Sequence, residues 1–216
     1  MRNVRFIYQK TGRAKFISHL DLNRLMIRVL KRSRLPVWFT EGFNSHAFIT
    51  FALPLSLGFE SSFDVMDFRV TDDSITNDEI LLKLKSALPP DIIAQKVYEP
   101  HTKAKIIRFA EFDVSLVCDS QNAEKLKAFF AADEIIVEKT TKKKEIKSFD
   151  VKPKIRDMRI TDREGGISVY ILLPAGNDEN INPMIIFDAA EKFGIEFDVE
   201  RVVRGIIFDE NMKPFE

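Results

Sequence analysis

Two of the three histidines, His19 and His46, lie in residues 16–58, which also hold the only tryptophan, Trp38. A histidine can act as a general acid or base, or contact a phosphate, because its charge changes near neutral pH. His19 opens a predicted helix, whose free backbone N–H groups favour anions; a structural hydrogen bond is the alternative role. His46 lies in a predicted exposed loop, and packing on a neighbouring aromatic ring is its alternative. Both histidines are candidates, and no catalytic residue is assigned.

Four cations follow His19 at helical spacing: Arg24, Arg28, Lys31 and Arg32. Side chains three, four, seven or eight positions apart share one face of a helix. Such a face can clamp phosphates, and a simple solvated helix face is the alternative. Asp21 is expected to cap this helix or pair with Arg24 or Arg28, in preference to a catalytic role.

Aromatic residues near these cations offer a second kind of contact with nucleic acid. Trp38, Phe39 and Phe43 could stack on bases, and core packing is the alternative for each of them. The predicted RNA- or anion-binding set combines this segment with two downstream lysines: Arg13, Lys15, Ser18, Arg24, Arg28, Lys31, Arg32, Phe43, Asn44, His46, Lys152 and Lys154.

The charges are concentrated although the formal net charge of the 216 residues is zero. Residues 1–58 hold ten Lys or Arg and two acids, a balance of +8. Residues 139–159 form a second basic segment with nine Lys or Arg and three acids, a balance of +6. Residues 164–216 have four basic and eleven acidic residues, a balance of −7. Two basic segments favour a polyanion-binding face over general surface charge, which is the alternative.

Composition narrows the class of protein. The single cysteine, Cys118, rules out an intramolecular disulfide and is expected to be a buried thiol. One cysteine and three scattered histidines make a zinc site improbable, so we expect no metal and no resident cofactor. The N-terminus has no signal-peptide pattern and no run is apolar enough for a membrane span, which predicts a cytoplasmic protein that does not contact membranes.

The pattern of residues 1–100 predicts the order strand, helix, strands, helix, strand. Ser18 is the expected cap of the first helix, and Pro36 its stop. Thr76 is expected to start the second helix. Residues 14–17, before the first helix, are expected to be extended. The strands are expected at residues 4–8, 37–39, 48–53, 63–70 and 92–97. This is a split βαβ, ferredoxin-like pattern with an extra hairpin at residues 37–57.

Residues 101–216 repeat this order. A long strand is expected at 106–117, helices at 123–131 and 183–193, and strands at 134–138 and 199–208. Glu164-Gly165-Gly166 predicts a hairpin turn between strands at 158–161 and 167–173. The basic segment is expected to be irregular or an edge strand because of Pro153. The predicted fold is α+β: two tandem ferredoxin-like units with antiparallel sheets, residues 1–100 and 101–216.

Residues 16–58 hold a recurring set of motif residues: Phe16, Ser18, His19, Leu20 and Asp21; Arg24, Arg28 and Arg32; Leu35 and Pro36; Gly42, Phe43, Asn44 and His46; and Phe51, Pro54, Leu55 and Gly58. With these residues the segment resembles the F-[IL]-S-H-L-D, G-[FY]-N-P-H-P and P-L-P-[LV]-G motifs of the radical-SAM-linked proteins, a bacterial family of unknown function. Ser45 and Ala47 stand where that family usually has prolines, and Phe48 where lysine is common. Asp150 and Pro153 are a weaker match to an Asp-x-x-Pro motif that the family has later in the chain.

The resemblance implies a partner more than a reaction. Members of that family are fused to, or encoded beside, a radical-SAM protein with a cobalamin-binding-type domain. This chain has no cysteine motif for an iron–sulfur cluster, so the partner would perform any radical chemistry. We therefore expect a non-catalytic companion that binds structured RNA, tRNA or rRNA, for a radical-SAM enzyme. The alternatives are a protein-interaction subunit that docks on that partner and a metal-independent endoribonuclease using His19 and His46.

Overall fold

A computed structural model describes residues 1–140 and 145–216, and the chain divides into two compact units. Unit 1 comprises Met1–Ile106 and Pro214–Glu216, and unit 2 comprises Ile107–Lys213. The described residues form four α-helices and ten strands, which confirms the predicted α+β class. None of the helices in these ranges has the length and hydrophobicity needed to cross a bilayer.

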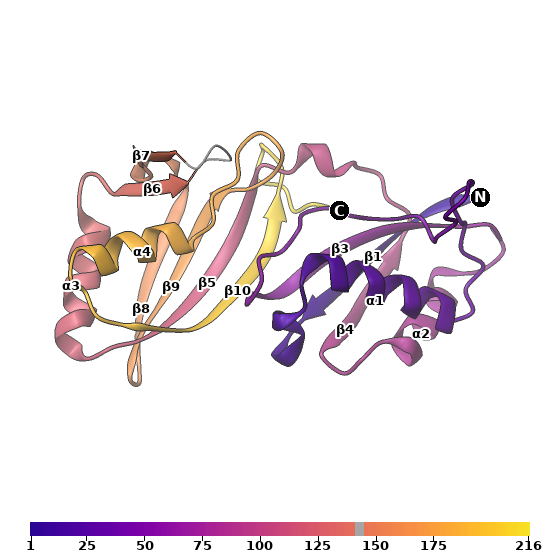
Figure 1. Ribbon diagram of the computed structural model, residues 1–216, viewed down its shortest axis with the longest axis horizontal. Helices are drawn as coiled ribbons and strands as arrows, with labels where there is room; N and C mark the ends of the chain where they lie inside the picture. The colour runs from indigo at the N-terminus through magenta and orange to yellow at the C-terminus, as the bar shows by residue number, and fades with distance from the viewer. Residues whose placement is uncertain (141–144) are drawn as a thin grey trace. The chain divides into compact units, whose positions relative to one another are not determined.

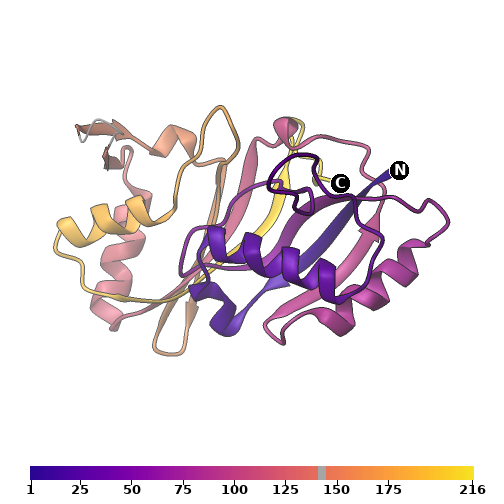
Figure 2. The same ribbon diagram turned by 45° about the vertical axis from the view of Figure 1, so that its right-hand side comes forward.

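In unit 1 four strands pair antiparallel, and two helices cover one face of them (Figures 1 and 2). The strands lie in the order β4-β1-β3-β2. In chain order the elements are β1 (Arg2–Lys10), α1 (His19–Arg32), β2 (Ile49–Phe51), β3 (Glu60–Val70), α2 (Asn77–Ala87) and β4 (Ile92–Tyr98).

Alternation along β1 separates two faces of this sheet. Val4, Phe6 and Tyr8 are buried in one apolar cluster with residues of both helices. The residues between them, such as Arg5, therefore belong to the face opposite α1 and α2. On α1 the predicted apolar face is confirmed, with Leu22, Met26, Val29 and Leu30 buried and Leu25 partly buried.

The structure of the segment that leads into α1, residues 11–21, differs in part from the prediction. Ser18 caps the helix as expected, because its hydroxyl accepts from the Asp21 N–H. In a capping box, a glutamate three residues after the cap also accepts from the backbone N–H of the cap residue. Here Asp21 takes the place of that glutamate, and its carboxylate accepts from the Ser18 hydroxyl instead. The capping box is therefore incomplete. Residues 14–17 were predicted to be extended, and this is wrong for most of them. A 3₁₀ helix spans Gly12–Phe16, with the Ala14 N–H donating to Thr11 and Ala14 buried in the core.

The segment after α1 is a hairpin with little regular strand. Phe39 bridges Ala47, and the Phe48 N–H donates to the Trp38 carbonyl, in keeping with the hairpin predicted at residues 37–57. The predicted strand at 37–39 is wrong as a regular element. Val37 bridges Val70 whereas Phe39 bridges Ala47, so the segment changes partner before a ladder can form.

The strands of unit 2 pair antiparallel in the order β10-β5-β9-β8, and β6 and β7 form a separate two-stranded hairpin. Figure 1 shows α4 beside this hairpin. In chain order the elements are β5 (Phe109–Val117), α3 (Ser120–Ala131), β6 (Ile136–Thr140), β7 (Ile146–Asp150), β8 (Asp157–Arg163), β9 (Gly166–Pro174), α4 (Met184–Lys192) and β10 (Asp198–Phe208).

Two features of unit 2 can be compared with the strand boundaries and the turn predicted from the sequence. The strand expected from residue 106 begins at Phe109, because Ala104–Ile106 forms a 3₁₀ turn. The predicted Gly165-Gly166 hairpin between β8 and β9 is confirmed. A Cβ on Gly166 would lie 2.0 Å from the Leu116 carbonyl oxygen, so a side chain at this position would clash with the adjacent strand β5.

Candidate nucleic-acid interface

The cations of α1 differ in whether they have an ion-pair or hydrogen-bond partner within the protein. Arg24 pairs with Asp21 at 3.1 Å, and hydrogen bonds from Ser18 and then Arg24 lower the pKa of that carboxyl. Arg28 and Lys31 are exposed and make no hydrogen bond or ion pair with a described residue. Their charges are therefore available to an external anion.

The Arg32 side chain contacts the C-terminal end of α2. Its guanidinium donates to the carbonyl of Ala87, the last residue of α2. A cation at the negative end of a helix stabilises the helix. Arg32 therefore joins α1 to α2, and its role as a phosphate ligand remains a prediction.

The loop between Thr40 and His46 exposes an aromatic side chain beside α1. Phe43 has a relative exposure of 106%, the value of a side chain that packs on nothing. The Thr40 N–H donates to the His46 carbonyl at 2.9 Å, which closes the loop at its base. The Lys31 ammonium lies 5.7 Å from the centre of the Phe39 ring, so the loop begins next to the C-terminal half of the helix.

The two candidate histidines contact different parts of unit 1. The His19 ring, at the first residue of α1, lies 5.1 Å from the Phe51 ring. The His46 Nδ1 lies 2.9 Å from the Asn44 carbonyl oxygen, so this side chain folds back on its own loop. No hydrogen bond or ring contact among the described residues joins the two histidines. A general acid and base must reach the same reacting phosphate, and the described contacts do not bring His19 and His46 together as such a pair.

The cations that precede α1 have acidic neighbours. Arg13 is exposed and lies 3.6 Å from Asp91. The Lys15 ammonium lies 3.8 Å from the carboxylate of buried Glu60. Both contacts lower the positive potential that these residues can offer to a polyanion. The basic face of unit 1 is thus carried mainly by the exposed part of α1.

The two predicted lysines of unit 2 have internal partners. The Lys152 ammonium donates to the Phe130 carbonyl near the end of α3, and Lys154 pairs with Glu179 at 3.2 Å. Asp150 accepts from the N–H groups of Ile135 and Lys152, so it holds the backbone in place. Three further lysines of the basic segment 139–159, Lys142, Lys143 and Lys144, lie outside the described residues.

Comparison with known proteins identifies the family. The model described as "Uncharacterized protein conserved in bacteria (DUF2344)" matches residues 3–183. The chain belongs to this DUF2344 family. No match was found among curated proteins.

Solved structures give two distant likenesses to the DUF2344 chain. One is a chain of a Cbf5-Nop10-Gar1 complex, at 10% identity and a TM-score of 0.47. That match covers 95% of this chain, which spans about half (50%) of the other chain. The second is a candidate glycine cleavage system transcriptional repressor, at 15% identity and a TM-score of 0.25, covering 94% of this chain and 98% of the other.

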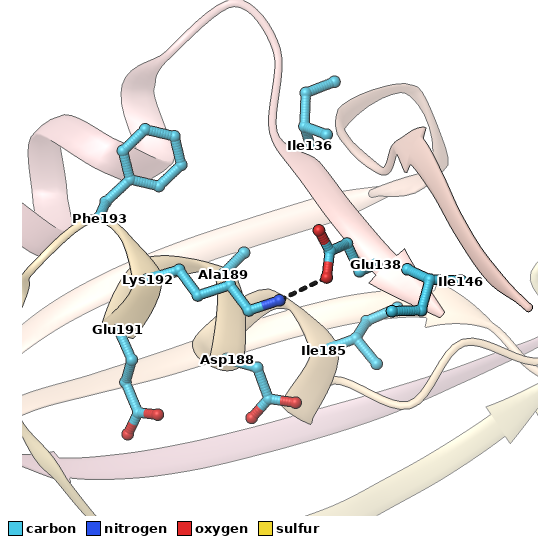
Figure 3. A pocket seen from close by; sticks show the side chains of 9 residues that line it. All are labelled: Ile136, Glu138, Ile146, Ile185, Asp188, Ala189, Glu191, Lys192 and Phe193. Carbon is cyan, nitrogen blue, oxygen red and sulfur yellow. Dashed lines mark hydrogen bonds and ion pairs between the residues drawn. The ribbon is translucent and has the colours of Figure 1, made fainter. Parts of the chain in front are cut away.

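A cavity of about 690 Å³ in unit 2 involves none of the predicted site residues (Figure 3). It lies between α4 and the β6–β7 hairpin, and its apolar side chains include Ile136, Ile146 and Phe193, all of them exposed. Figure 3 shows Lys192 extending from α4 to Glu138 on β6, at 2.5 Å. Asp188 and Glu191 leave the lining with a net negative charge. This cavity suits a cationic or apolar ligand better than a phosphate backbone.

One buried ion pair was not predicted from the sequence. Arg5 is completely buried and binds both carboxylate oxygens of Asp67 at 2.8 Å. The only local signal is that each of them interrupts a run of apolar residues in a strand.

Cys118 was predicted to be a buried thiol, and in the structure it is half-buried. This burial raises the pKa of the thiol, which disfavours the nucleophilic thiolate. Among the described residues, no three His, Cys, Asp or Glu side chains are grouped to hold a metal ion.

Proposed function

We propose that this DUF2344 chain binds structured RNA, tRNA or rRNA, through α1 and the Thr40–His46 loop, as the non-catalytic companion of a radical-SAM enzyme. The observation that carries the RNA proposal is the combination of unpaired cations on α1 with the fully exposed Phe43 ring. The partner proposal rests on the resemblance of residues 16–58 to radical-SAM-linked proteins.

The spacing of the cations supports contact with an extended polyanion. Arg24, Arg28 and Lys31 occupy about 10 Å of α1, given a rise of about 1.5 Å per residue. Their long side chains can reach successive phosphates while their Cα atoms stay fixed. Sequence-specific RNA recognition targets unpaired bases, which stack on aromatic side chains. Phe43 would supply such a stacking surface, while the cations bind the neighbouring backbone.

We further propose that both units are ferredoxin-like. In each unit the fourth strand lies beside the first, followed by the third and the second, if the β6–β7 hairpin counts as an insertion. The pairings of these strands within each unit are antiparallel. This is the order expected of a split βαβ unit.

Binding to total tRNA and to rRNA at 50 and 200 mM salt tests the RNA proposal. If three phosphates are contacted with a slope of about 0.7 to 0.9 each, affinity falls roughly 20- to 40-fold over this range. Absence of binding at 50 mM salt, or affinity that does not change with salt, rejects it.

The acidic, partly apolar cavity of unit 2 favours a second function, docking on the radical-SAM protein. Its occupant would be a basic amphipathic segment of that partner, because the lining combines Asp188 and Glu191 with exposed Ile146 and Phe193. Co-purification under anaerobic conditions tests this function. Phe193→Ala should weaken retention of the partner, whereas Leu82→Ala, at an exposed position of α2, should not. Equal retention by both variants rejects the docking site.

A further inference from the structure

A cavity of about 500 Å³ lies in unit 1, and its lining includes no residue of α1 or of the Thr40–His46 loop. Its strand residues Asn3, Asp67 and Arg69 occupy the sheet face opposite α1 and α2. The segment after β4 contributes the rest of the lining, including His101 and Lys103. No residue of this cavity is used by the functions proposed above.

The Arg69 side chain is held in place, and part of its guanidinium remains available as a hydrogen-bond donor. Its guanidinium carbon lies 4.8 Å from the centre of the Phe48 ring and 5.3 Å from that of Trp38. Its Nε donates to the Asn3 side-chain oxygen at 3.1 Å. The two terminal amino groups have no hydrogen-bond partner among the described residues. Such an ordered guanidinium presents a planar pair of N–H donors that matches a carboxylate or phosphate.

The acidic residue in the cavity does not cancel this charge. Both oxygens of Asp67 accept from Arg5, so that carboxylate is already paired. Arg5 also donates to the hydroxyl and the carbonyl oxygen of Thr102, at 3.1 and 2.9 Å. These bonds fix the backbone between His101 and Lys103, whose side chains are exposed and make no hydrogen bond or ion pair with a described residue. The cavity therefore has a net positive charge.

We propose that this cavity binds an oxyanion, a phosphate or a carboxylate, carried by a ligand no larger than a mononucleotide. Arg69 binds the oxyanion through its two terminal amino groups, and Lys103 supplies a second cation at the rim. The aromatic rings of Trp38 and Phe48 hold the guanidinium plane, on the far side of the sheet from α1. The volume lies within the usual range for small-molecule sites.

The single tryptophan makes the site directly measurable, because Trp38 contacts Arg69. Inorganic phosphate, AMP and succinate are titrated at constant ionic strength, with indole fluorescence and calorimetry as independent readouts. We expect saturable binding of at least one probe, with a Kd below about 1 mM. Phosphate or AMP binding without succinate binding identifies a phosphate site, and the reverse identifies a carboxylate site. Absence of saturable binding by both methods rejects the proposal.

Variants locate the binding. Arg69→Gln should weaken it at least about tenfold, and Arg69→Lys should lose most of it because the planar pair of donors is gone. Lys103→Gln, at an exposed side chain, should weaken it without affecting folding. Lys83→Gln on α2 is the matched control and should leave it unchanged. Affinity that is the same in the Arg69 and Lys103 variants as in wild type places the anion elsewhere and overturns the proposal. RNA binding should survive Arg69→Gln, so the two proposals fail separately.

Discussion

Replacing Phe43 with alanine should separate RNA binding from stability. The ring is fully exposed, so its removal takes no apolar surface out of the core. We expect the free energy of unfolding to change by less than about 0.5 kcal/mol. The corresponding change at buried Phe68 would cost about 3–5 kcal/mol. Stacking of a base on an aromatic side chain contributes about 1–3 kcal/mol, so RNA affinity should fall roughly 5- to 150-fold.

The assay is a binding titration with the tightest-bound tRNA or rRNA, accompanied by denaturant unfolding of each variant. Leu82→Ala removes another exposed apolar side chain, on α2, and should alter neither quantity. RNA affinity within twofold of wild type for Phe43→Ala would refute the stacking role. A loss of more than about 1 kcal/mol in stability would instead show that the ring packs within the fold.

Three further substitutions test local interactions. Thr76→Ala removes the hydroxyl that caps the Glu79 N–H and should cost about 1 kcal/mol in denaturant unfolding; an unchanged midpoint would contradict the cap. Arg32→Gln should cost about 1 kcal/mol in denaturant unfolding through the lost bond to Ala87; an unchanged midpoint would contradict this contact. Partial desolvation raises the pKa of Asp113 although the residue is exposed on β5, so its ionised form costs a little stability at neutral pH, and this cost disappears below the ordinary pKa of 3.8. Asp113→Asn should therefore stabilise the protein at pH 7 but not at pH 3; equal effects at both would contradict this assignment.

The sequence predicts best what depends on near neighbours. The apolar face of α1 follows from helical periodicity, and the Ser18 cap from a hydroxyl three residues before its donor. The turn at Gly165-Gly166 is likewise local, because Gly165 has a φ of 75°, a backbone conformation that glycine adopts readily. These features were predicted because one turn or one strand determines them.

The free and paired cations could not be distinguished from the sequence. Arg28 and Arg32 occupy the same helix, yet only Arg32 meets the carbonyl of Ala87, 55 residues away. The partner of Lys152 is a carbonyl 22 residues earlier in the chain. Arg5 and Asp67 are 62 residues apart and meet only through the register of β1 and β3. Each of these contacts depends on tertiary packing, for which the local sequence has no signal.

The salt dependence of RNA binding by an α1 variant tests the central claim most directly. The double variant Arg28→Gln/Lys31→Gln removes the two cations of α1 that have no hydrogen bond or ion pair among the described residues. The control, Lys83→Gln/Lys85→Gln, makes the same change in charge on the exposed side of α2. For the α1 variant, the slope of log affinity against log salt should fall by about 1.4 to 1.8, and the control should keep the wild-type slope. Equal slopes for wild type and the α1 variant, or equal losses in both variants, would contradict binding through α1.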